Sequence, residues 1–201
     1  MYKLYDFLPS GNSYKVRLLF NLLEIPFERI NLNILEGATR TPEFLQKNPN
    51  GRIPLLEVTP GKFLAESNAI LYYLSQGTTF FPEDSYAQGQ VMQWLFFEQY
   101  SHEPNIATSR YWISILKQPE QYQTQLNQKH QLGNAALEVM EQHLSHKKFL
   151  VEETYTIADI ALYGYTHVAE EGGFKLLQFP NILSWLKRIA AHPKHILITD
   201  C

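Results

Sequence analysis

The chain has 201 residues, with 17 Lys and Arg against 20 Asp and Glu, and its single cysteine, Cys201, is the last residue. This length fits one or two domains with a buried core, and 45% hydrophobic against 18% charged residues is a globular composition. One cysteine excludes an internal disulfide framework, a cysteine-rich zinc site and a CxxC redox pair, so thiol chemistry has to use Cys201 or a thiol from outside.

The charge pattern also narrows the class of partner. A formal net charge of −3, without any basic stretch, argues against binding to nucleic acid. No apolar run approaches the roughly 18 residues of a membrane helix, and the N-terminus lacks the apolar core of a signal peptide. We therefore expect a cytoplasmic protein without a membrane partner.

The first 75 residues alternate short strand-like and helix-like segments. The patterns predict strands at 2–5, 27–32, 54–58 and 62–64, and helices at 13–23, from 42 and from 67. A crossover helix joins the first two strands, so these strands should be parallel. The order βαβ, connecting helix, ββα predicts an α/β domain over residues 1–75.

A second, helical domain is expected after a linker. Residues 76–85 break all periodicity, and long helical patterns then cover roughly 84–116, 120–146, 156–169 and 180–191. Pro104 interrupts the first of these patterns and predicts a kink near His102 and Glu103. Thr156 and Asp159 have the spacing of a capping box, which we assign to folding. The second domain is expected to span 86–201.

The turn Ser10-Gly11-Asn12 follows the first strand and precedes a helix. In the simplest interpretation Ser10, Asn12 or Ser13 is an ordinary N-cap. A hydroxyl at this place also lies beside the backbone N–H groups and the positive dipole end of the helix, which favour an anion.

Two further motifs follow in the same domain. Ile53-Pro54 leads into the third strand, and the sequence leaves open whether this X-Pro bond is cis. Glu66-Ser67 precedes the third helix. Ser67 as a plain N-cap beside a solvated acid is one interpretation. The other is an α-amino acid site, with Ser67 and the helix amides on the carboxylate and Glu66 on the ammonium.

In this order, and on this pattern of elements, the motifs resemble those of the soluble glutathione transferases. The matching segments are Ser10-Gly11-Asn12, Arg52-Ile53-Pro54, Glu66-Ser67 and Thr156-Ile157-Ala158-Asp159. The resemblance covers the whole chain and implies a thioredoxin-like N-terminal domain followed by an all-helical domain. The serine-first turn is similar to that of the theta-, phi- and bacterial-type branches. The lack of a cysteine in the turn argues against the omega- and beta-like branches.

The resemblance implies a thiol-activating role for the first motif. Ser10 would donate a hydrogen bond to the glutathione sulfur and hold it as a thiolate, and Asn12 would assist. The implied activity is attack of this thiolate on small hydrophobic electrophiles, as in detoxification. A non-catalytic module that binds ligands or proteins is an alternative, as is glutathione-dependent isomerase, dehalogenase or peroxidase activity in the same site.

The resemblance also assigns the remaining contacts to glutathione. Ile53 would pair its backbone with the cysteinyl part, with Pro54 cis, and Glu66 and Ser67 would hold the γ-glutamyl ammonium and carboxylate. The candidates near the glycyl carboxylate are Arg52 and, with less support from its surroundings, Arg40.

The sequence gives less information about the electrophile pocket and about the oligomeric state. Possible pocket residues, for each of which helix packing is at least as good an explanation, are Tyr100, Asn105, Tyr111 and Trp112. The family implies a homodimer. The pairs His143/His146 and His192/His195 lack a third ligand nearby in sequence, so we expect no metal site.

Overall fold

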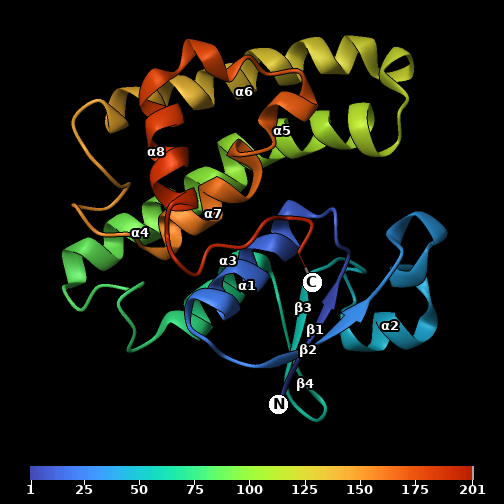
Figure 1. Ribbon diagram of the computed structural model, residues 1–201. Coiled ribbons are helices and arrows are strands. Elements are labelled where there is room, and N and C mark those ends of the chain that lie inside the picture. Colours follow the sequence, from blue (N-terminus) through green and yellow to red (C-terminus); the bar gives the residue numbers. More distant parts are fainter. Residues whose placement is uncertain (201) are drawn as a thin grey trace. The chain divides into compact units, whose positions relative to one another are not determined.

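The computed structural model describes residues 1–200 (Figure 1). Cys201, the one thiol that the chain itself could supply, lies outside the described residues. The chain divides into two compact units, one made of Met1–Gln76 and the segment from Pro193 onward, and the other of Gly77–His192.

The first unit is built on a four-stranded mixed sheet with the strand order β2-β1-β3-β4. β1 and β2 are parallel, as the sequence predicted, whereas β3 is antiparallel to both β1 and β4. Its elements are β1 (Tyr2–Asp6), α1 (Gly11–Leu22), β2 (Phe27–Asn31), α2 (Pro42–Lys47), β3 (Leu55–Thr59), β4 (Lys62–Ala65) and α3 (Ser67–Ser75), with 3-10 turns at Ile34–Glu36 and Ala38–Arg40.

Alternation along the strands gives the sheet two apolar faces. α1 packs against α3 beside one face, and Figure 1 shows α2 on the other side of the sheet. On the α2 side, Tyr5, Phe44 and Leu55 form a buried cluster to which Ile53 also packs. This thioredoxin-like arrangement confirms the expected α/β domain.

The strand register brings the three motifs to one edge of the sheet. In the antiparallel pair β1–β3, Tyr5 near the end of β1 lies opposite Leu55 at the start of β3. In the pair β3–β4, Leu55 also lies opposite Ala65, the last residue of β4. The segments that follow β1, precede β3 and follow β4 therefore meet at the same edge.

The second unit is built from helices, as predicted, with an isolated β-bridge between Val151 and Thr154. Pro104 lies near the start of α5, and the turn before it, Glu98–His102, is π-helical. Proline lacks an N–H and clashes with the preceding turn, so the irregularity expected at this place is confirmed. The elements are α4 (Ser85–Phe97), α5 (Glu103–Arg110), a second π-helical turn (Tyr111–Ile115), α6 (Gln123–Leu144), α7 (Ile157–Thr166) and α8 (Pro180–Ala190), with 3-10 turns at Pro119–Tyr122, Ala169–Gly172 and Leu176–Gln178.

The end of the chain belongs to the first unit, which differs from the expected helical domain over 86–201. The Tyr14 hydroxyl donates to the Ile196 carbonyl at 2.7 Å, and the Asn21 amide donates to the Lys194 carbonyl at 2.6 Å. Figure 1 shows this red C-terminal segment running beside α1. The tail lacks a helical or strand pattern of its own, and its backbone is held by side chains of α1.

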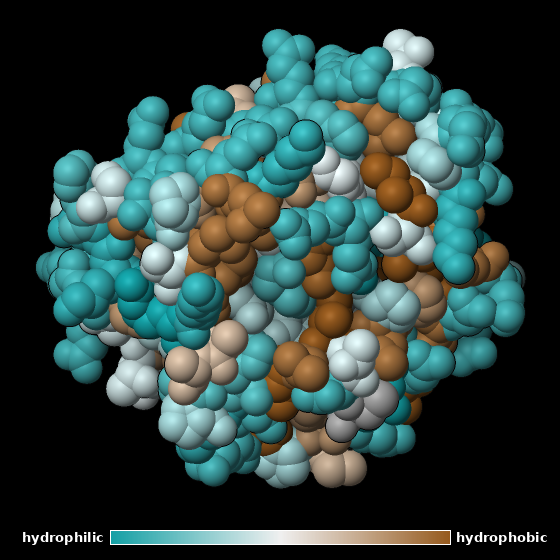
Figure 2. All heavy atoms as spheres, turned by 45° about the horizontal axis from the view of Figure 1, so that its top comes forward, coloured by the Kyte–Doolittle hydropathy of each residue, from teal (hydrophilic) through white to brown (hydrophobic). Residues whose placement is uncertain are grey.

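On the face shown in Figure 2, hydrophobic residues reach the surface in patches between hydrophilic residues. The most exposed large hydrophobic side chains of the second unit include Tyr86, Phe96, Tyr100 and Leu177. Within the described residues, no helix combines the length and the apolar character needed to cross a bilayer. The homodimer stays a prediction.

Candidate functional site

Ser10 is the N-cap of α1. Its Oγ accepts a hydrogen bond from the Ser13 amide at 3.2 Å, and its own carbonyl accepts from the Tyr14 amide at 2.9 Å. The structure thus selects Ser10 among the three possible caps. A hydroxyl that accepts through a lone pair still carries a hydrogen to donate, and Ser10 is only half-buried. Capping the helix and donating to a ligand are therefore compatible.

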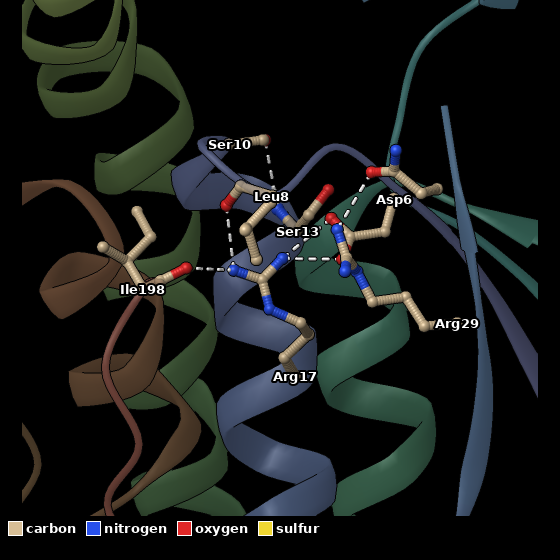
Figure 3. A network of polar contacts seen from close by, with 8 residues as sticks. Asp6, Leu8, Ser10, Ser13, Arg17, Arg29 and Ile198 are labelled. Atoms are coloured by element: carbon tan, nitrogen blue, oxygen red, sulfur yellow. Dashed lines mark hydrogen bonds and ion pairs between the residues drawn. The ribbon is translucent and has the colours of Figure 1, made fainter. Parts of the chain in front are cut away.

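A buried guanidinium fixes the loop that carries Ser10 (Figure 3). Arg17 donates from Nη1 to both oxygens of the fully buried Asp6 carboxylate, at 2.7 and 2.8 Å. Its Nη2 donates to the Leu8 carbonyl at 3.0 Å and to the Ile198 carbonyl at 2.8 Å. Arg29 adds a second cation on Asp6. One side chain thus ties the end of β1, the Ser10 loop and the C-terminal tail to α1.

Asn12, Lys15 and Ser67 form a polar cluster between α1 and α3. The Lys15 ammonium donates to Asn12 Oδ1 at 2.7 Å and to Ser67 Oγ at 3.5 Å, and the Ser67 hydroxyl donates to Asn12 Oδ1 at 3.2 Å. Lys15 is fully buried and Ser67 nearly so. The cluster joins the first and third motifs directly.

Glu66 occupies a strained backbone position at the junction of β4 and α3. Its φ is 69° and its ψ is 115°, and it is the N-cap of α3 without making a side-chain cap bond. The prediction of Ser67 as the N-cap is wrong by one position, because this left-handed turn starts the helix earlier and makes Ser67 its first residue. Such strain costs about 1–3 kcal/mol and is concentrated at ligand sites. The Glu66 carboxylate is exposed.

The side chain of Asn48 holds the second motif, Arg52-Ile53-Pro54, in place. The peptide bond between Ile53 and Pro54 is cis, as the resemblance implied. Asn48, a buried residue, donates from Nδ2 to the Arg52 carbonyl at 2.8 Å and accepts from the Asn50 amide at 3.1 Å. Asn48 thereby fixes the loop that precedes the cis bond, and it leaves the Arg52 side chain exposed.

Arg40 lies against the same loop. Its Nη1 donates to the Asn50 carbonyl at 3.1 Å. Gly51 has φ +63°, and a Cβ there would lie 2.5 Å from the Arg40 guanidinium, so glycine permits this close approach. The structure brings Arg40 against the loop that leads into Arg52, a contact that no motif around Arg40 had indicated.

The four proposed pocket residues of the second unit have different surroundings. Tyr100, in the first π-helical turn, is 88% exposed, whereas Asn105 is buried and donates to the Ser101 carbonyl at 2.7 Å. Tyr111 and Trp112 lie in the second π-helical turn, where Trp112 stacks on Tyr122 at 4.4 Å between ring centroids. Their role toward an electrophile stays a prediction.

Reasoning from sequence missed Lys15, Arg17 and Asn48. The signal for the first two was available: they lie within a helix flanked by Tyr14, Val16 and Leu18, which are buried. Charged side chains on such a helix need buried partners. Among residues 1–200 no group of three His, Cys, Asp or Glu side chains is arranged to hold a metal ion.

The comparisons with known proteins agree with this geometry. Residues 1–76 match the family described as "Glutathione S-transferase, N-terminal domain", and residues 97–193 match "Glutathione S-transferase, C-terminal domain". The crystal structure of a glutathione S-transferase from Pseudomonas fluorescens Pf-5 has a TM-score of 0.97 and 49% identity, covering 99% of both chains.

Two more distant relatives are informative, one because its structure contains a ligand and the other because its name gives an activity. A glutathione transferase family member from Pseudomonas fluorescens Pf-5 with two glutathione bound has a TM-score of 0.83 and 26% identity, covering 96% of this chain and 89% of its own. Disulfide-bond oxidoreductase YfcG of Escherichia coli strain K12 is 27% identical over 93% of this chain and 89% of its own. Because the two family matches together span most of both units, the chain belongs to the glutathione S-transferase family.

Proposed function

We propose that the protein binds glutathione at the sheet edge of the first unit and activates its thiol for attack on small hydrophobic electrophiles. The observation that carries this proposal is the convergence of the three motifs, since the register brings Ser10, Ile53 and Ser67 to one edge of the sheet. Chemistry of this kind needs a hydrogen-bond donor at the sulfur, and groups for the two charged ends of the tripeptide.

The side chains present fit such a ligand. Ser10 supplies a hydroxyl at the start of α1, where the helix dipole also favours a thiolate. Ser67 and the first amides of α3 suit the γ-glutamyl carboxylate, and the exposed Glu66 carboxylate suits the adjacent ammonium. Arg40 and Arg52 offer guanidinium groups for the glycyl carboxylate.

The reaction needs no acid or base from the protein once the thiol is ionised. The thiol proton leaves to solvent, and the sulfur lone pair forms a C–S bond to the electrophilic carbon. For an aryl halide, the halide departs with the electrons of the broken C–X bond. A hydrogen bond to an ionised group contributes about 1.5–3 kcal/mol and a helix terminus about 0.3–1 kcal/mol, so Ser10 and α1 suffice to favour the thiolate.

Two relatives support glutathione as the ligand. The bacterial neighbour at 49% identity is a glutathione S-transferase, and the neighbour solved with two glutathione molecules shares the fold over 96% of this chain.

A second candidate is glutathione-dependent disulfide reduction, favoured by the relative named a disulfide-bond oxidoreductase. The one cysteine of this chain is residue 201. In this candidate the sulfur atoms therefore come from glutathione: one glutathione thiolate attacks the substrate disulfide and releases a thiolate. A second glutathione then attacks the mixed disulfide, so that one glutathione disulfide forms per disulfide reduced.

Two measurements separate the candidates. Retention on immobilised glutathione tests binding, and turnover against aryl halides, isothiocyanates, hydroperoxides and a small disulfide tests the reaction. Conjugation of the first two classes supports the transferase, and reduction of the disulfide without conjugation supports the second candidate. Retention without any turnover favours a non-catalytic binding module, and no retention overturns the proposal.

A further inference from the structure

The C-terminal tail, which begins at Pro193, is held along α1 through its backbone. Every second carbonyl of the tail accepts a hydrogen bond from an α1 side chain. The pairs are Asn21 with the Lys194 carbonyl at 2.6 Å, Tyr14 with the Ile196 carbonyl at 2.7 Å and Arg17 with the Ile198 carbonyl at 2.8 Å. The tail is thus part of the fold of the first unit, and these three bonds use none of its side chains.

The last of these bonds shares its donor group with the turn that carries Ser10. This turn is closed by a hydrogen bond from the Ser10 amide to the Phe7 carbonyl at 2.8 Å. Inside the turn, the Leu8 carbonyl accepts from Arg17 Nη2 at 3.0 Å, and the same nitrogen donates to the Ile198 carbonyl (Figure 3). Nη2 has two hydrogens, so the turn and the tail use both of them.

Arg17 has little freedom to exchange one partner for another. Its side chain is almost completely buried, and Nη1 is paired with the Asp6 carboxylate. Its Nε is also buried, and the described residues offer it no partner. A guanidinium is planar and its hydrogens point in fixed directions. Loss of the Ile198 carbonyl would therefore leave a second N–H of this buried cation unpaired, and the guanidinium would move toward water and away from Leu8.

We propose that the C-terminal tail positions the Ser10 turn through Arg17, so that activation of the thiol depends on a docked chain end. This inference rests on the proposed function and adds to it two positioning groups, the Arg17 guanidinium and the Ile198 carbonyl, that the proposed mechanism does not use. With the tail docked, the Leu8 carbonyl is fixed and so is Ser10, two residues later. With the tail undocked, the turn loses this bond and Ser10 spends less time where it can donate to the sulfur.

The test compares two shortened chains. A chain that ends at Lys194 lacks the Ile196 and Ile198 carbonyls, whereas a chain that ends at Asp200 retains all three tail bonds and is the matched control. Per folded molecule, the shorter chain should turn over an aryl halide about three- to tenfold more slowly than the control, the effect of about one lost hydrogen bond. The thiol of bound glutathione should ionise at higher pH, while the KM for glutathione should change little, because the second and third motifs are untouched. A purely structural tail would lower stability without moving this ionisation.

A change at Arg17 tests the route of the effect. Arg17→Lys keeps a cation beside Asp6 but lacks the planar fork that serves the Leu8 and Ile198 carbonyls together. In this background the chains that end at positions 194 and 200 should ionise the bound thiol at the same pH, because the tail acts through Arg17.

A full-length variant covers the case in which the shorter chain does not fold. Tyr14→Phe combined with Asn21→Ala removes two of the three donors to the tail and should raise the pH of ionisation by a smaller amount. An unchanged ionisation in the shorter chain, or in this full-length variant where the shorter chain does not fold, would overturn the inference and leave the proposed function intact. So would an effect of shortening that is equally large in the Arg17→Lys background. Wild-type protein that binds no glutathione overturns both.

Discussion

The starts of α7 and α3 show opposite ways to begin a helix. At α7, Thr156 Oγ1 accepts from the Ala158 amide, and Asp159 accepts from the Thr156 amide, which completes a capping box. At α3 no side chain caps the helix, and the residue before it, Glu66, has a left-handed backbone. The first start satisfies its own polar groups and serves folding. The second is strained and leaves its first turn without a side-chain cap, which suits a ligand.

The start of α1 is intermediate between these two. Ser10 caps the helix through a single bond, and Ser13, three residues later, has a buried hydroxyl for which the described residues offer no partner. In α7 the corresponding position holds Asp159, which closes the box. The comparison therefore predicts that changes at α7 act on stability, and that changes at α1 and α3 act mainly on glutathione.

The largest effect is expected at α7. The Asp159 carboxylate also accepts from the Leu150 amide and from Trp185 Nε1, both at 2.9 Å. Asp159→Ala leaves these buried donors unpaired and should lower the free energy of unfolding by about 3–4 kcal/mol at neutral pH. Urea unfolding measures this loss, while turnover per folded molecule should not change. A variant as stable as wild type would contradict the folding role.

The pH dependence of stability also tests the folding role of Asp159. Burial raises the pKa of Asp159 from 3.8 to about 6, although its hydrogen bonds oppose the shift. The folded protein then holds this proton more tightly than the unfolded chain, so the contribution of Asp159 to stability falls as the pH rises between these values. Relative to Asp159→Asn, the wild-type free energy of unfolding should decrease by about 2 kcal/mol from about pH 4 to about pH 7. A constant difference across this range would show that Asp159 ionises normally.

At α1 the effect should fall on catalysis. Ser10→Ala removes the proposed donor to the sulfur and should lower turnover with an aryl halide at least tenfold, with a loss of only about 1 kcal/mol in stability from the cap. Affinity for glutathione should be largely preserved, because Ile53, Glu66 and Ser67 are untouched. Unchanged turnover would exclude Ser10 as the thiolate donor.

The smallest effect is expected at α3. Glu66→Gly relieves the left-handed backbone and should stabilise the protein by about 1 kcal/mol, while it weakens glutathione binding roughly tenfold through loss of the carboxylate. Glu152, with φ 52° in the second unit, is the matched control. Glu152→Gly should give a similar stabilisation and leave the affinity unchanged. Equal affinities for the two glycine variants would exclude Glu66 from the binding site.

Much of the fold followed from local patterns. The order of strands and helices, the parallel first pair, the irregularity before Pro104 and the capping box at Thr156 each depend on a few neighbouring residues, and the structure has all of them. The tail was assigned to the helical domain because its place depends on Tyr14, Arg17 and Asn21, which lie more than 170 residues earlier in the chain. A bond between such distant residues leaves no local pattern.

Some residues of the candidate site could likewise be predicted from local patterns, and others could not. The motifs with Ser10, Ile53 and Glu66 were visible because turns, X-Pro bonds and helix starts have local signatures. Lys15 is two residues after a cap candidate, but its partner Ser67 is 52 residues away. Only the packing of α1 against α3 brings this lysine into contact with the third motif.

The most direct test of the account is the pH at which the thiol of bound glutathione ionises. Thiolate absorbance is followed against pH for glutathione alone, for its complex with wild-type protein and for its complex with Ser10→Ala. Wild-type protein should move the ionisation to clearly lower pH, and Ser10→Ala should move it most of the way back. A bound thiol that ionises at the same pH as free glutathione would contradict the central claim that this site activates the sulfur.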